Sequence, residues 1–132
     1  MANEKILVVD DDKNICELLR LYLVKEGYNV TMVHDGGAAL AEFDKLHPDL
    51  VLLDVMMPVM DGCEAARAIR ALARPDARTV PIVAVTANAF AEDVAATTAA
   101  GMDAHVSKPI DFTVLCRTLS GLVARRRGGD RA

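Results

Sequence analysis

The chain has 132 residues, of which 52% are hydrophobic and 26% charged, and its formal net charge is −4. This length and composition are typical of one globular domain with a buried core and exclude a disordered chain. The net negative charge argues against direct nucleic-acid binding, which needs a clustered basic excess.

Cysteine usage and hydropathy indicate the compartment. The three cysteines Cys16, Cys63 and Cys116 lie far apart and form no C-x-x-C pair, which favours a reduced setting. No apolar run reaches the ~18–20 residues of a membrane span, and the first residues have no signal-peptide character. We therefore expect a cytoplasmic protein without membrane insertion.

Strand and helix patterns alternate from the start of the chain. Residues 5–10 form an apolar run that ends in aspartate. Apolar residues then recur at helical spacing, at Ile15, Leu18, Leu19, Tyr22 and Leu23. Residues 29–33 predict a more polar strand, and a helix is expected between Asp35 and Pro48.

The second half of the chain continues this alternation. Strands and helices are predicted in turn near residues 50–54, 62–73, 81–86, 90–100, 104–107 and 112–123. The runs at 50–54 and 81–86 are apolar almost throughout, as central strands are, whereas 104–107 is typical of an edge strand. Five strands alternating with five helices predict an α/β fold, a doubly wound parallel sheet with helices on both faces.

Four predicted strands lead into polar residues. The first ends in Asp10 and Asp11, the third in Asp54 and the fourth in Thr86, and the fifth leads into Lys108. Each residue alone is explained as well by a cap, a turn or a solvated loop. Together they point to a site, because ligands bind beyond the carboxyl ends of parallel strands.

The residue types at this edge indicate phosphoryl chemistry. Clustered carboxylates raise each other's pKa unless a cation neutralises them, and an all-oxygen site with open positions suits Mg²⁺. A carboxylate beside Mg²⁺ can attack phosphorus and form an aspartyl phosphate. Lys108 can supply positive charge and Thr86 a hydrogen bond to the phosphoryl oxygens.

Four segments of the sequence resemble the response-regulator receiver family, in family order and spacing: residues 6–12, 53–62, 85–88 and 107–110. Two further segments, 88–93 and 101–111, are most similar to receivers associated with hybrid histidine kinases. The resemblance implies a flavodoxin-like sheet with strand order 2-1-3-4-5. We expect a receiver domain over residues 1–124 and a basic, flexible tail over 125–132.

The resemblance also implies roles for the acidic residues. Asp54 would be the phosphoacceptor. Asp11 and Asp54 would bind Mg²⁺ directly, together with the backbone carbonyl of Met56, whereas Asp10 would act through a bound water. Asp12 is one place further on and is expected to cap a helix instead.

Three further positions would contact the phosphoryl group or respond to it. The resemblance implies that Thr86 and Lys108 contact it. His105 stands where many receivers carry a tyrosine or phenylalanine that moves on phosphorylation. It is either a polar residue of an edge strand or a smaller, pH-responsive switch.

The implied function is a phosphorelay switch. A histidine kinase or a histidine-phosphotransfer protein would pass a phosphoryl group to Asp54, and the helix near residues 90–100 would respond. The chain would be no enzyme beyond assisting its own phosphorylation and slow dephosphorylation, and its downstream target is a protein that the sequence does not specify.

Two alternatives stay open. One is a Mg²⁺-dependent phosphohydrolase that works through an aspartyl phosphate, which is disfavoured because Met56 stands where such enzymes carry a second aspartate. The other is a pseudo-receiver that binds partners without phosphate. The intact set of residues at the strand ends disfavours it.

Overall fold

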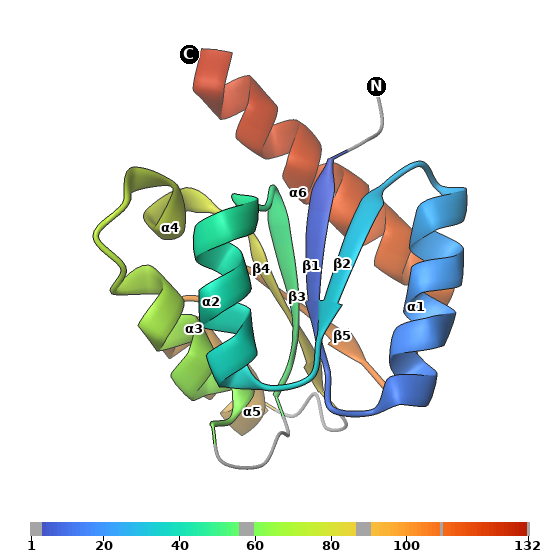
Figure 1. Ribbon diagram of the computed structural model, residues 1–132, viewed down its shortest axis with the longest axis horizontal. Helices are drawn as coiled ribbons and strands as arrows, with labels where there is room; N and C mark the ends of the chain where they lie inside the picture. The colour runs from blue at the N-terminus through green and yellow to red at the C-terminus, as the bar shows by residue number, and fades with distance from the viewer. Residues whose placement is uncertain (1–3, 56–59, 87–90, 109, 132) are drawn as a thin grey trace.

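The sheet has five parallel strands, and helices cover both of its faces (Figure 1). The computed structural model describes residues 4–55, 60–86, 91–108 and 110–131, and only the backbone of 91–93 and 126–131. The strands are β1 (Lys5–Val9), β2 (Asn29–Val33), β3 (Leu50–Asp54), β4 (Ile82–Thr86) and β5 (Ala104–Ser107). Their order is β2-β1-β3-β4-β5, which confirms the predicted order and the two predicted edge strands.

The helices pack as two layers, one on each face of the sheet. They are α1 (Lys13–Lys25), α2 (Gly36–Leu46), α3 (Gly62–Arg70), α4 (Pro75–Thr79), α5 (Ala91–Ala99) and α6 (Phe112–Arg131). Leu19 of α1 and Leu115 of α6 are fully buried against one face, and Phe43 of α2 and Ile69 of α3 against the other. None of the described helices is long and apolar enough to cross a bilayer.

Aspartates cap the first turns of α1, α2, α3 and α6. Asp12 accepts hydrogen bonds from the backbone N–H groups of the first turn of α1, as its predicted role as a cap requires. Asp35 does the same for α2, and Asp61 forms a reciprocal capping box with Glu64 at the start of α3. Asp111 accepts from the first turn of α6 in the same way. These caps fix where each helix leaves the edge of the sheet.

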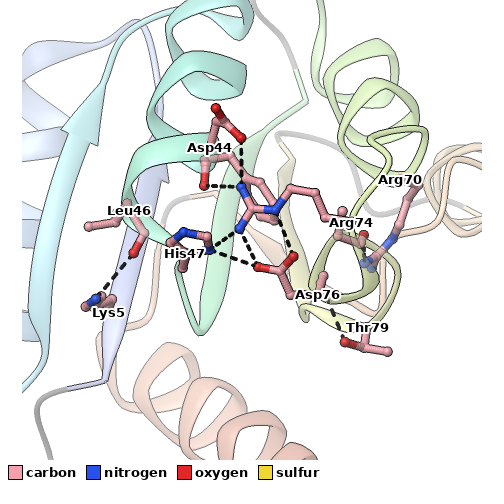
Figure 2. A network of polar contacts seen from close by, with 10 residues as sticks. Lys5, Asp44, Leu46, His47, Arg70, Arg74, Asp76 and Thr79 are labelled. Carbon is pink, nitrogen blue, oxygen red and sulfur yellow. Dashed lines mark hydrogen bonds and ion pairs between the residues drawn. The ribbon is translucent and has the colours of Figure 1, made fainter.

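The short helix α4 is a difference from the five helices that the sequence predicts. It begins at Pro75, whose ring suits the first turn of a helix, and Arg74 before it makes no capping hydrogen bond. Figure 2 shows the Arg74 guanidinium between Asp76 of α4 and Asp44 of α2, at 2.6 and 3.2 Å, with His47 also in contact. Ala77 of α4 and Val80 after it are fully buried in the core, and the ionic contacts of Arg74 add a link to α2.

The last helix is longer than predicted. The sequence predicts a flexible tail over residues 125–132, whereas the backbone of α6 is helical as far as Arg131. Alanine and arginine, which follow the last buried residue, are among the better helix formers. The domain boundary at residue 124 stays a prediction.

Candidate functional site

Two buried carboxylates define the site. Asp54 is the last residue of β3 and Asp10 follows β1, the neighbouring strand, and their exposed fractions are only 2% and 1%. Asp11 is next in the chain and is exposed. One carboxylate oxygen from each of the three lies within 4.8 Å of the others. The structure thus brings together the acidic residues that the sequence placed at one edge of the sheet.

Asp10 has one satisfied and one unsatisfied carboxylate oxygen. Its Oδ1 accepts a hydrogen bond of 2.9 Å from the N–H of Asp12. Its Oδ2 has no hydrogen-bond partner among the described residues, although it is buried. Burial raises the pKa of Asp10, and the hydrogen bond from Asp12 and the charge of Lys108 oppose that rise. A buried, unpaired carboxylate oxygen is costly, and a bound cation would satisfy it.

Lys108 supplies a positive charge to this cluster. Its Nζ lies 3.4 Å from Asp54 Oδ1 and 4.0 Å from Asp10 Oδ2, and its side chain is 25% exposed. Its backbone N–H donates to the carbonyl oxygen of Thr86 at 2.8 Å. This hydrogen bond continues the pairing of β4 with β5 and fixes the position of the Lys108 backbone. When all are ionised, three carboxylates and one ammonium carry a net charge of −2, which a divalent cation would balance.

Thr86 is the last residue of β4, the strand beside β3. It is 4% exposed and follows Val85, which is paired with Asp54 across β3 and β4.

The backbone of Asp54 is packed against the start of α3. A Cβ added at Gly62 would lie 2.5 Å from the Asp54 carbonyl oxygen, so only glycine allows this close approach.

The remaining predicted positions lie partly outside the described residues. Met56, the expected carbonyl ligand, belongs to 56–59, and the loop after Thr86 belongs to 87–90, and neither is described. His105 lies on β5 opposite Ala84, and thus on the same face of the sheet as Thr86. Its Nε2 contacts the hydroxyl of Thr97 on α5.

The direction of the bond between His105 and Thr97 follows from the other partner of Thr97. The Thr97 hydroxyl donates its only hydrogen to the carbonyl oxygen of Val94 at 3.1 Å. His105 must therefore donate from Nε2 to the Thr97 oxygen. The structure thus connects the predicted switch residue to α5.

The sequence predicted no role at the site for two residues that lie beside Asp10. Cys16 Sγ and His34 Nδ1 lie 3.3 and 3.0 Å from the carbonyl oxygen of Asp10. Burial, followed by the negative charge of Asp10, raises the pKa of the Cys16 thiol to about 11, so that thiol is protonated at neutral pH. Strand order offered a signal for His34, because Val33 is paired with Val9 and the next residues on the two strands must then be neighbours.

Comparisons with known proteins identify relatives over nearly the whole chain. Residues 6–120 match the family model of the response regulator receiver domain. Sensory transduction protein RegX3 of Mycobacterium tuberculosis is 38% identical over 125 residues, which are 95% of this chain and 52% of that protein. DNA-binding response regulator MtrA of Mycolicibacterium smegmatis is 42% identical over 80% of this chain and 44% of its own length. The chain therefore spans about half the length of these curated relatives.

Solved structures show the same fold. The receiver domain of the sensor histidine kinase PA1611 from Pseudomonas aeruginosa, which has a magnesium ion coordinated in its active-site cleft, has a TM-score of 0.84 and 35% identity. It is matched over 92% of this chain and 98% of its own. A CheY-like receiver domain protein from Methanospirillum hungatei has a TM-score of 0.87 at 28% identity, over 96% and 98% of the two chains. With the family model spanning most of its residues, this chain belongs to the response regulator receiver domain family of two-component systems.

Proposed function

We propose that the chain is the phosphoacceptor of a two-component phosphorelay and that Asp54 receives the phosphoryl group from a phosphohistidine. The donor is a histidine kinase or a histidine-phosphotransfer protein. The observation that carries the proposal is the Lys108 ammonium, 3.4 Å from the carboxylate of Asp54, which is itself buried among acidic residues at the strand ends. Membership of the receiver family supports the same assignment.

The transfer requires little from the protein beyond alignment and charge. A carboxylate oxygen of Asp54 attacks phosphorus, and the bond from phosphorus to the histidine nitrogen breaks with its electron pair going to the imidazole. Lys108 offsets the negative charge on the phosphoryl oxygens as a point charge. The Thr86 hydroxyl can donate a hydrogen bond to one of those oxygens.

The donor set fits Mg²⁺. The clustered carboxylate oxygens of Asp10, Asp11 and Asp54, among them the Asp10 Oδ2 that lacks a hydrogen bond, are hard, anionic ligands of the kind this ion takes. We propose that Asp11 and Asp54 bind it directly, with the backbone carbonyl of Met56, and Asp10 through water. When bound, the ion adds the positive charge that the lysine alone does not supply. A magnesium ion in the PA1611 receiver domain supports this choice.

The proposal describes a signalling protein, not an enzyme with an external substrate. Met56 stands two residues after Asp54, where phosphohydrolases of this chemistry carry an acid/base aspartate. Output through protein contact is proposed because the net charge of −4 disfavours a nucleic-acid-binding surface. A cytoplasmic location is proposed because the three cysteines are free and far apart in sequence. The DNA binding named for MtrA belongs to a protein of which this chain covers 44%.

Labelling with radioactive acetyl phosphate tests the proposal. The wild-type chain should gain label when Mg²⁺ is present and stay unlabelled when EDTA is present from the start, and Asp54→Asn should remove the label. Asp61→Asn is the matched control, because asparagine still caps α3 and the residue lies outside the acidic cluster. Equal labelling of the wild type and the Asp54→Asn variant would contradict the assignment.

A further inference from the structure

The backbone carbonyl of Asp10 receives hydrogen bonds from two side chains on different elements. Cys16 reaches it from α1 at 3.3 Å, and His34, which follows β2, reaches it at 3.0 Å. Cys16 Sγ and His34 Nδ1 lie 3.7 Å apart, so the two side chains converge on one oxygen. A carbonyl oxygen only accepts, so the thiol and the Nδ1–H must both donate.

Together with two further hydrogen bonds, these bonds hold the backbone and one carboxylate oxygen of Asp10 in place. Its N–H donates to the carbonyl oxygen of Val33 at 3.2 Å, and its Oδ1 accepts from Asp12 at 2.9 Å. The backbone on both sides of the residue and one carboxylate oxygen are thereby held. The remaining atom, Oδ2, is the buried oxygen without a hydrogen-bond partner among the described residues, and it lies 4.0 Å from Lys108 Nζ.

We propose that His34 and Cys16 are positioning residues that set the Mg²⁺ affinity of the acidic cluster by fixing the backbone of Asp10. The inference rests on the proposed function for the identity of the metal. Groups that orient metal ligands act through hydrogen bonds of this kind, and their loss weakens metal binding without removing a ligand. A loosened Asp10 would spend less time in the position in which its carboxylate and that of Asp11 converge with Asp54.

His34 is the better position for the experiment because its side chain is exposed whereas Cys16 is 2% exposed. The variants His34→Asn and His34→Leu form a matched pair. The asparagine amide can place a donor near the position of Nδ1, and leucine has similar bulk without a donor. Cys16→Ser and Cys16→Ala form the corresponding buried pair, in which only serine keeps a donor.

The measurement is calorimetric titration of Mg²⁺ into metal-free protein, with thermal unfolding in EDTA recorded for each variant. His34→Leu should raise the Mg²⁺ dissociation constant by about three- to tenfold, the equivalent of one ordinary hydrogen bond. His34→Asn should stay near the wild type, and cooperative unfolding in EDTA should show that both variants are folded. Acetyl-phosphate labelling of His34→Leu should recover its wild-type rate at saturating Mg²⁺.

The outcomes separate this inference from the proposed function. If the wild type binds Mg²⁺ and the leucine and asparagine variants both bind it as tightly as the wild type does, the inference alone is overturned. An equal loss of affinity in both members of the His34 pair overturns it as well, because the donor would then not matter. Failure of the wild type to bind Mg²⁺ overturns the proposed metal site and the inference together.

Discussion

Asp10 and Asp54 are nearly as buried as the leucines around them, yet both are carboxylates. Such groups are costly inside a protein unless charges or hydrogen bonds compensate them. Lys108 offsets part of the charge, and Asp10 Oδ2, which has no hydrogen-bond partner among the described residues, shows where compensation is incomplete. The cluster therefore lowers the stability of the metal-free protein in exchange for a site prepared to bind a cation.

This imbalance predicts a pH dependence for metal-free protein. Because burial raises the folded-state pKa of Asp10 above its unfolded value, the folded state holds the proton more tightly. The stability that protonated Asp10 contributes is fully present below the unfolded pKa and is lost as pH rises through the folded pKa. Asp10→Asn is neutral at every pH and should avoid that loss.

We expect Asp10→Asn to be more stable than the wild type at neutral pH in EDTA by about 1–2 kcal/mol, a usual size for one substitution. The difference should shrink as the pH falls toward the ordinary aspartate range. Urea unfolding at a series of pH values measures it. A variant less stable than the wild type at neutral pH, or a difference that does not change with pH, would count against this account of the cluster.

At the level of secondary structure elements, Arg70, the last residue of α3, organises the connection to β4. Arg70 donates to the carbonyl oxygens of Ala77, Val80 and Gly101, and pairs with Asp103 at 3.0 Å. It thereby joins α4 to the end of α5. Burial lowers the pKa of the Arg70 guanidinium, and Asp103 opposes that shift.

Arg70 is expected to matter for folding stability. Arg70→Met leaves several partly buried carbonyl oxygens without donors and should lower the free energy of unfolding by about 2–3 kcal/mol. Arg70→Lys should recover only part of this loss, because an ammonium cannot reproduce the planar fork. Urea denaturation of the three proteins measures the effect.

The matched control is Arg20→Met. Arg20 pairs with Glu17 at 2.8 Å, but both side chains are exposed, at 49% and 63%. An exposed pair of this kind contributes little, so no measurable change is expected. Equal effects of the two methionine variants would show that the Arg70 contacts do not stabilise the connection.

The strands and helices also show which parts of the fold the sequence patterns predict. The five strands were predicted because their apolar runs are bounded by aspartates and turns, and β2, β3 and β5 match at every residue. Helix α4 was not predicted, because its five residues are too few for a helical pattern and only Ala77 among them is buried in the core. A flexible tail was predicted beyond residue 124 because that segment is polar, basic and contains glycine, whereas the backbone of α6 is helical as far as Arg131.

In the whole molecule, the parallel sheet brings the site together from distant parts of the chain. The acidic cluster and Lys108 were predictable, because parallel strands place their carboxyl ends at one edge, the lower edge of the sheet in Figure 1. The bonds from Cys16 and His34 to Asp10 were not, because they depend on side-chain direction. The same holds for the contact of His105 with Thr97, which connects the edge strand to α5.

The central claim is that Asp54 carries the phosphoryl group, and chemical trapping tests it most directly. An aspartyl phosphate is reduced by borohydride, whereas an unmodified aspartate is not. After treatment with acetyl phosphate and Mg²⁺, then borohydride, peptide mass spectrometry should find homoserine at position 54 and unmodified aspartate at positions 10, 11 and 61. Homoserine at one of those other positions, or an unreduced Asp54 in protein that carries label, would contradict the account.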